Sequence, residues 1–177
     1  MKATGVVRRI DELGRIVIPK EIRKTLRIKE GESLEIYIDD KENILLKKYS
    51  LMNKIEDFAQ DFTDSIYAFT KHNVFIIDTD KVIAATGNLK KKYLGKNISE
   101  KLEKSIYRRE SLIEKFEKEL EITNNEMELG TYVISTIVVS GDPAGAVIIF
   151  SEEESITDSD GKIAGIAAQF LAKHLEE

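Results

Sequence analysis

The pattern of apolar and polar positions in the first fifty residues predicts short strands. Residues 4–10 and 15–18 are rich in β-branched side chains and flank a turn of sequence DELG, so each predicts a short strand. Two later stretches, 33–39 and 43–49, are also rich in apolar strand-forming residues and are separated by a run of polar residues. This arrangement predicts a β-hairpin.

One short helix is predicted between these two pairs of strands. Pro19 suits the first turn of a helix, where the N–H groups have no intrahelical partner, and residues 20–26 continue as helix. Ile22 and Leu26 are four residues apart and share one face. We therefore expect these two side chains to anchor the helix inward, with an opposite basic face formed by Lys20, Arg23, Lys24 and Arg27.

After residue 50 the spacing of apolar positions becomes helical in three places. A helix is expected to begin near Ser99, whose hydroxyl is suited to an N-cap. Steps of four and three residues through 51–70 predict a connecting helix with a seam of Leu51, Ile55, Phe58, Phe62, Ser65 and Phe69. The segment after Thr157 predicts a last helix with a stripe of Ile163, Ile166, Ala167, Phe170, Leu171 and His174.

Four further stretches predict strands, because they are rich in β-branched residues and bounded by turn residues. They are residues 72–78, 81–87, 131–139 and 144–150, and the lysine-rich segment 90–92 is expected to be a loop. Helices and strands in this order indicate an α+β domain, in which helices pack against an antiparallel sheet.

Length and composition indicate two domains. A chain of 177 residues suits a small module followed by a domain of ordinary size. All seven phenylalanines follow residue 49, so a new hydrophobic core is expected to begin there. We expect one domain at residues 1–50 and a second at residues 51–177, with 51–70 as a connecting helix.

The absence of cysteine rules out disulfides, thiolate metal sites and cysteine nucleophiles. No run of eighteen apolar residues occurs, and the N-terminal sequence lacks the apolar segment of a signal peptide. We therefore expect a cytoplasmic protein with no membrane partner.

Charge is distributed unevenly along the chain. Residues 1–29 carry nine basic and three acidic side chains, whereas residues 49–177 carry 15 basic and 23 acidic ones. A basic end joined to an acidic body is typical of a nucleic-acid contact confined to that end. The alternative is that these charges only keep a small domain soluble.

The first 48 residues are too few to bury a sufficient core as a monomer. Chains of this size are marginal without a metal, a disulfide or a partner. This segment contains neither cysteine nor histidine. By elimination we expect an obligate dimer in which strands of two chains share one core.

The stretch from Thr4 to Tyr49, with the uninterrupted core LGRIVIPKEIR, resembles the swapped-hairpin DNA-binding domain of the AbrB family of bacterial transition-state regulators. The rest of the chain, with VVSGDPAGAVIIF near its end, resembles a GAF domain. The resemblance implies a regulator of sporulation genes, an activator or a repressor, active in the forespore. It also implies dimers built from interleaved N-terminal domains that join through the C-terminal domains into a tetramer.

The resemblance also implies which side chains bind double-stranded DNA. The family's DNA-contacting arginines correspond to Arg8, Arg15 and Arg23, and Lys24 stands where an arginine is common. Lysine keeps the charge but loses the planar fork that grips a phosphate or a guanine with two hydrogen bonds. Two further basic residues, Arg9 and Lys20, are second-rank candidates, and for them a solvated surface charge is an equal alternative. Because no long recognition helix is expected, sequence preference should depend on DNA deformability as well as on base contacts.

No set of residues in the sequence indicates catalysis, a cofactor or a metal site. The two histidines, His72 and His174, are far apart and have no neighbouring residues at metal-ligand spacing. Neither a dinucleotide-binding nor a P-loop motif occurs. The aspartates Asp78, Asp80 and Asp142 fall in or near turns, where a carboxylate caps backbone amides more often than it catalyses.

A small-molecule effector is expected only from the GAF resemblance. Effectors of such domains bind between the sheet and its covering loops, here residues 88–97 and the helix that follows. The identity of the ligand is unknown, and the alternative is a domain kept only for assembly, with a collapsed pocket.

Two other functions compete with a transcriptional regulator. The same N-terminal fold occurs in antitoxins, which bind their toxin through a disordered acidic tail, whereas residues 51–177 read as a folded domain. The third hypothesis is an allosteric enzyme with a DNA-binding appendage, against which the missing catalytic set counts.

Overall fold

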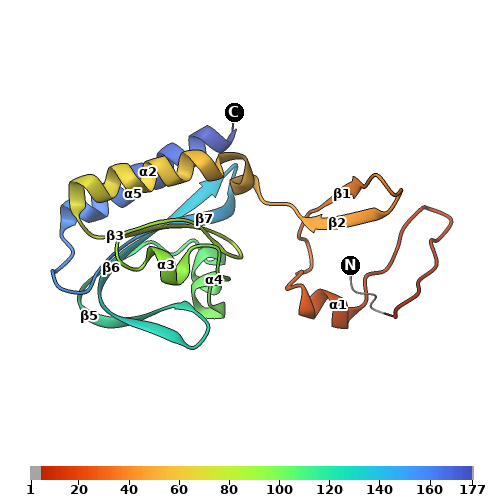
Figure 1. Ribbon diagram of the computed structural model, residues 1–177, viewed down its shortest axis with the longest axis horizontal. Coiled ribbons are helices and arrows are strands. Elements are labelled where there is room, and N and C mark those ends of the chain that lie inside the picture. The colour runs from red at the N-terminus through yellow and green to blue at the C-terminus, as the bar shows by residue number, and fades with distance from the viewer. Residues whose placement is uncertain (1–4, 177) are drawn as a thin grey trace. The chain divides into compact units, whose positions relative to one another are not determined.

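The computed structural model describes residues 5–176 and divides the chain into two compact units (Figure 1). Unit 1 is Met1–Tyr49 and unit 2 is Ser50–Glu177.

Unit 1 contains one helix and one hairpin. Helix α1 is Lys20–Thr25, and strands β1 (Leu34–Ile38) and β2 (Ile44–Lys48) pair antiparallel, from Leu34 opposite Lys48 to Ile38 opposite Ile44. The predicted helix and hairpin are therefore confirmed. The strands predicted at 4–10 and 15–18 are wrong for the described part of the single chain, where residues 5–19 form no ladder; Thr4 lies outside that part. A strand needs a neighbour in register, and none of the described residues of unit 1 provides one for this segment.

The apolar side chains of unit 1 are exposed to solvent in the single chain. None of its residues that the structure describes is buried. Exposed apolar side chains occur on its loop, on α1 and on both strands, namely Val6, Val7, Ile10, Leu13, Ile16, Val17, Leu26, Ile36, Tyr37, Ile38, Ile44, Leu46 and Tyr49. A fold with this much uncovered apolar surface lacks a core of its own.

Unit 2 is built on a five-stranded antiparallel sheet with the strand order β4-β3-β7-β6-β5. Each strand pairs antiparallel with its neighbours. The strands are β3 (Asn73–Asp78), β4 (Val82–Thr86), β5 (Leu112–Thr123), β6 (Glu126–Val139) and β7 (Asp142–Ser151). β4 and β5 are the edge strands of this sheet.

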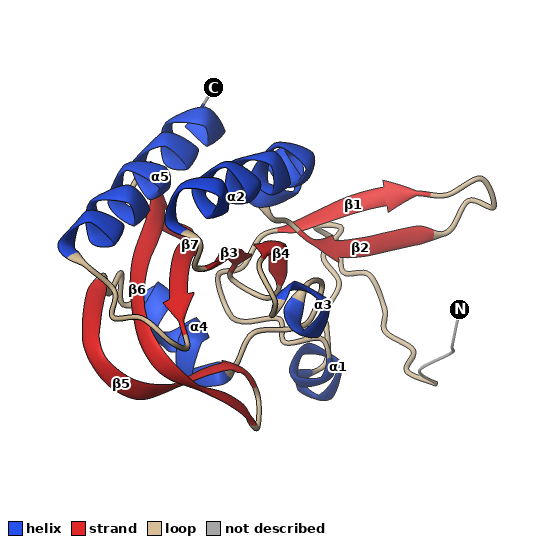
Figure 2. Ribbon diagram, turned by 60° about the vertical axis from the view of Figure 1, so that its left-hand side comes forward, coloured by secondary structure: helices blue, strands red, loops and turns tan. Residues whose placement is uncertain are grey.

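Helices cover both faces of this sheet (Figures 1 and 2). On one face lie the short 3₁₀ helix η1 (Leu51–Ile55), α2 (Glu56–Thr70) and α5 (Asp158–Glu176), and the other face carries α3 (Lys90–Tyr93) and α4 (Glu100–Tyr107). Each layer has its own core: Ala59, Ala164 and Leu171 pack on Ile76 and Ile149, whereas Tyr93, Leu102 and Ile106 pack on Phe75 and Ile148.

Several predictions for unit 2 are confirmed and others are wrong. The hydroxyl of Ser99 accepts the backbone N–H of Leu102 and caps α4, as predicted. Residues 90–92 are the first turn of α3 and not a loop, because Tyr93 turns inward and is completely buried. Strand β5 was not predicted, since most of its side chains are exposed and charged.

The predicted helical stripes are correct only in part. In α5, Ala167 and Leu171 are buried, but Ile166 is 66% exposed and Phe170 48% exposed. In the connecting helix Phe69 is 80% exposed. The sheet therefore contacts one side of each predicted stripe and leaves the other side uncovered. Within residues 5–176 no helix is long and apolar enough to span a membrane.

Candidate DNA-binding surface and effector pocket

The loop before α1 holds three of the candidate DNA-binding residues. Arg8 and Arg9 are exposed, and Arg15 follows the turn that starts at Asp11. Asp11 Oδ1 accepts the backbone N–H groups of Leu13 (3.0 Å) and Arg15 (2.8 Å). Gly14 has a φ of +74°, a left-handed conformation that glycine adopts without strain.

The Arg15 side chain is tethered but remains accessible. Its Nε donates to Asp11 Oδ2 at 2.8 Å, yet 72% of the side chain is exposed. The backbone N–H and the guanidinium of Arg15 lower the pKa of Asp11, so the pair remains charged. One edge of the guanidinium is thus oriented by the turn, while the other nitrogens face solvent and can contact a phosphate or a base edge.

Helix α1 carries the other three candidates. Lys20 and Lys24 are exposed, whereas Arg23 is half-buried, so this arginine is less outward than predicted. Leu26, predicted to anchor the helix inward, is 54% exposed, because none of the described residues of unit 1 covers this side. The structure therefore brings Lys20, Arg23 and Lys24 onto one helix, preceded by the loop with the other arginines.

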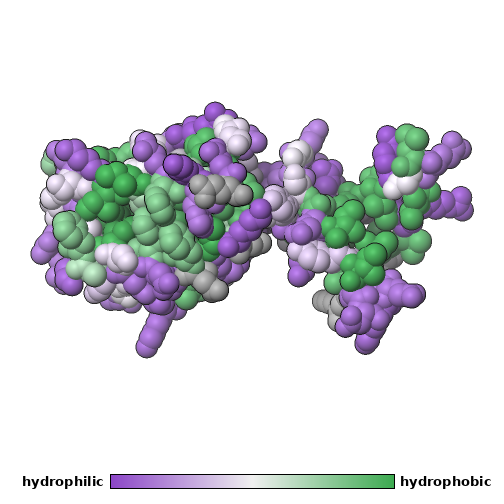
Figure 3. Space-filling model, turned by 90° about the horizontal axis from the view of Figure 1, so that it is seen from above, coloured by the Kyte–Doolittle hydropathy of each residue, from purple (hydrophilic) through white to green (hydrophobic). Residues whose placement is uncertain are grey.

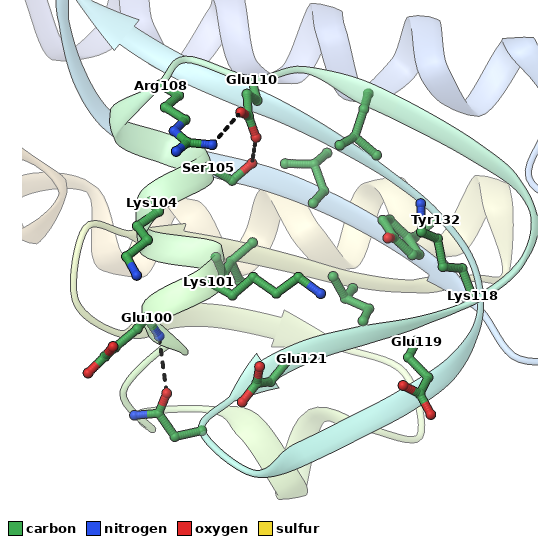
Figure 4. A pocket seen from close by; sticks show the side chains of 15 residues that line it. Glu100, Lys101, Lys104, Ser105, Arg108, Glu110, Lys118, Glu119, Glu121 and Tyr132 are labelled. Atoms are coloured by element: carbon green, nitrogen blue, oxygen red, sulfur yellow. Dashed lines mark hydrogen bonds and ion pairs between the residues drawn. The ribbon is translucent and has the colours of Figure 1, made fainter.

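Unit 2 contains a cavity of about 550 Å³ between α4 and the strands β5 and β6 (Figure 4). This size is within the range of small-molecule pockets. Its apolar lining is formed by Leu102, Leu112, Leu120, Tyr132 and Ile134. Its polar lining is formed by Glu100, Lys101, Lys104, Ser105, Arg108, Glu110, Lys118, Glu119, Glu121 and Asn124.

Some of these charged groups are already paired. Arg108 lies 3.6 Å from Glu110, which also accepts the Ser105 hydroxyl at 2.9 Å. Lys118 donates to Glu114 at 2.8 Å, and this contact raises the pKa of the lysine. The Lys118 ammonium therefore remains charged at neutral pH.

The pocket differs from the one expected. The helix after residue 97, α4, forms one wall as expected, but residues 88–97 do not line the cavity. That segment instead packs Tyr93 edge-on against Phe75, with ring centroids 5.9 Å apart. The second wall of the cavity was not predicted from the sequence, because strand β5 was not predicted. The alternating acidic and basic residues of β5 were the only sequence feature that could have indicated this strand.

Two other titratable residues that the sequence analysis singled out, Asp78 and His174, have structural roles. Asp78 is buried at the end of β3 and accepts the backbone N–H groups of Asp80 and Lys81, both at 2.6 Å. His174 stacks on Phe58, with ring centroids 5.0 Å apart. Among the described residues no group of histidine, cysteine, aspartate and glutamate could hold a metal ion.

Unit 1 is small and basic and has an uncovered apolar surface, and unit 2 is a sheet domain with a cavity of ligand size. These features define the class of proteins that join a DNA-binding module to a second folded domain. A family model described as stage V sporulation protein T C-terminal, transcription factor, matches residues 54–176. The chain belongs to the stage V sporulation protein T family of transcription factors.

Curated relatives match the two units differently. The chain is 46% identical to stage V sporulation protein T of Bacillus subtilis (strain 168) over 178 aligned positions, covering all of both chains. Over 49 residues it is 65% identical to the transition state regulatory protein AbrB of the same organism, covering 28% of this chain and 50% of that one. A second model, of the bacterial antitoxin MazE, matches residues 7–52.

Solved structures resemble unit 2 in fold. The GAF domain of an Acinetobacter phosphoenolpyruvate-protein phosphotransferase matches with a TM-score of 0.57 at 11% identity, covering 73% of this chain and 84% of that one. A free methionine-R-sulfoxide reductase from Thermoplasma acidophilum has the same score at 13% identity, covering 71% and 95%. At these identities the likeness establishes a GAF-like fold and not an activity.

Proposed function

We propose that this protein regulates the transcription of sporulation genes by binding double-stranded DNA through unit 1. The observation that carries the proposal is the set of accessible basic side chains in unit 1, in which Asp11 orients Arg15 and the lysines of α1 are exposed. Guanidinium groups contact both phosphates and guanine edges, so they supply affinity as well as sequence preference. The contact set is Arg8, Arg9, Arg15, Lys20, Arg23 and Lys24.

Unit 1 acts as a dimer in this proposal. Its uncovered apolar side chains, such as Val17, Ile36 and Ile44, need a partner surface, and residues 5–19 need a strand to pair with. A second copy of unit 1 provides both. The half-buried Arg23 and the exposed Leu26 then lie at or near the surface that two chains share.

Unit 2 joins such dimers into a tetramer. Apolar side chains gather over α2 and α5 (Figure 3). Phe62 stacks on Phe58 and on Phe170 from α5, with ring centroids 5.7 and 5.5 Å apart, and the rings of Phe58 and Phe170 are tilted at 6.0 Å. Beside them Ile166 is 66% exposed, and a second copy of this helix pair can cover it. Two linked DNA-binding dimers on one particle raise avidity by about 10² when the DNA reaches both.

The cavity beside α4 serves as the effector site in this proposal. The protein acts in the forespore cytoplasm. It does not catalyse a reaction.

The antitoxin function is supported less well. The match to the antitoxin model ends at residue 52, and the chain continues as the folded sheet domain of unit 2. Antitoxins of that kind instead use a disordered segment to bind the toxin.

The test is DNA binding by the full chain and its alanine variants. Arg15→Ala and Arg23→Ala are each expected to weaken the affinity for promoter DNA about tenfold, since a charged contact is lost while the fold remains. Lys41→Ala is the matched control, because Lys41 lies exposed in the β1–β2 turn of the same unit. Equal affinity of all three variants and the unchanged protein would refute the assigned surface.

A further inference from the structure

The cavity beside α4 is lined by polar groups that have no partner among the residues that the structure describes. Tyr132 is only 6% exposed, yet its hydroxyl forms no hydrogen bond with the described residues. In Figure 4 this hydroxyl faces the enclosed space. The hydroxyl is therefore available to bond with water or with a ligand in the cavity.

Two of the four basic residues of the cavity are also unpaired. Arg108 and Lys118 have carboxylate partners, whereas Lys101 and Lys104 form no ion pair with any residue that the structure describes. The side chain of Lys101 reaches from α4 toward β5, across the space that the lining residues enclose (Figure 4). Its ammonium is therefore free to meet an anion bound there.

Three of the four carboxylates of the cavity are paired or point away from it, and the fourth, Glu119, is exposed on β5. Glu110 is occupied by Arg108 and Ser105, and Glu121 accepts the backbone N–H of Asn125 at 3.0 Å. Glu100 lies in the first turn of α4, where the helix dipole favours a negative charge, and in Figure 4 it points away from the cavity. The lining thus has equal numbers of acidic and basic residues, which disfavours a ligand with several negative charges.

We propose that the effector is a small amphipathic monocarboxylate, with its carboxylate held by the ammonium of Lys101 and the hydroxyl of Tyr132. Its apolar body lies on Leu102, Leu120 and Ile134. This inference rests on the effector role proposed for unit 2, and it adds the chemical class of the ligand. In Figure 4 the Lys104 ammonium lies on the side of α4 away from β5, so Lys101 is the unpaired lysine that reaches across the cavity. A single negative charge beside an apolar body is what this ammonium, the Tyr132 hydroxyl and an apolar floor can satisfy together.

Three probes with one naphthalene body and different charges test the proposal on the full chain. Fluorescence titration is expected to show that 2-naphthoate binds at least tenfold more tightly than 2-naphthamide or 2-naphthylmethylammonium, because only the carboxylate pairs with Lys101. Lys101→Met should weaken 2-naphthoate binding about tenfold, and Tyr132→Phe should weaken it by less.

The control is Lys91→Met, which removes an exposed lysine from the same side of the sheet but outside the cavity. The proposal is overturned if the amide or the ammonium binds as tightly as the carboxylate, if 2-naphthoate does not bind, or if Lys101→Met behaves like Lys91→Met. DNA affinity of the unchanged protein without any probe is measured in parallel. Its loss would count against the proposed function, whereas failed probe binding with intact DNA binding would count only against the ligand class.

Discussion

The side-chain amide of Gln60 pairs with the backbone of Ala85 as a neighbouring strand would. Its Nε2 donates to the Ala85 carbonyl oxygen at 3.1 Å, and its Oε1 accepts the Ala85 N–H at 3.4 Å. Ala85 lies on the edge strand β4, so these backbone groups have no strand partner on that side. Helix α2 thereby closes the edge of the sheet at this point and protects it from pairing with other chains.

Gln60→Glu is expected to lower the free energy of unfolding by about 1–3 kcal/mol. A carboxylate cannot donate to the Ala85 oxygen, and it is placed near the carboxylate of Asp64, which now binds the same amide nitrogen at 2.9 Å. Urea unfolding at one fixed protein concentration measures the difference. Gln169→Glu, an exposed position on α5, is the control and should change stability by less than about 0.5 kcal/mol.

DNA affinity should depend steeply on salt. If a dimer contacts about eight phosphates, the logarithm of the association constant falls with the logarithm of salt concentration with a slope of roughly −7. If Arg15 binds a phosphate, its removal should make the slope less negative by about one for each chain that contacts DNA. A slope near zero would contradict an electrostatic contact.

A fragment that ends at Ser50 should be a dimer that unfolds on dilution. Each chain leaves side chains such as Val17 and Ile36 exposed, so folding and association are coupled and the unfolding midpoint rises with concentration. Circular dichroism melts over a hundredfold range of concentration measure this. A folded monomer at low concentration would disprove the obligate dimer.

Ile166→Asp should separate tetramers into dimers and leave unit 2 folded, because Ile166 is 66% exposed within one chain. Sedimentation velocity of the full chain gives the mass, and circular dichroism reports the fold. Phe62 is a poorer choice, since it packs against the core and its replacement would also destabilise the domain. Phe116→Asp is the control, as Phe116 is 81% exposed on β5; an unchanged mass for Ile166→Asp would exclude this interface.

The buried carboxyl of Asp78 should make stability depend on pH in a defined direction. Burial raises its pKa, against the lowering effect of the backbone N–H groups of Lys81 and Asp80. The folded state therefore holds the proton more tightly than the unfolded state, and this contribution is complete below the unfolded pKa of about 3.9 and is lost as pH rises through the folded pKa.

Asp78→Asn isolates this effect, because an amide keeps one acceptor for the turn and cannot ionise. The free energy of unfolding of the unchanged protein minus that of the variant should be larger at pH 5 than at pH 8. The change is at most about 1.4 kcal/mol for each unit by which the pKa is raised. Urea unfolding at both pH values measures it. A difference that stays constant or increases with pH would contradict the raised pKa.

Local sequence determined those elements whose signals do not depend on distant residues. Ser99 could be predicted as an N-cap because the hydroxyl bonds the N–H three residues later, and β3 and β7 could be predicted because their buried runs lie between turn residues. The basic residues of unit 1 could also be named, since charge and order along the chain are properties of the sequence itself.

Tertiary structure alone decided which face of each element is covered. Strand β5 exists because β6 pairs with it, although its side chains alternate in charge and read as a solvated segment. Ile166 and Ala167 are neighbours in a stripe that looks uniform in sequence, but only Ala167 contacts the sheet. The cavity likewise joins Lys101 to Tyr132, 31 positions later, because α4 packs on one face of the sheet in which β6 pairs with β5. Burial depends on the partner surface, and a single segment does not contain that information.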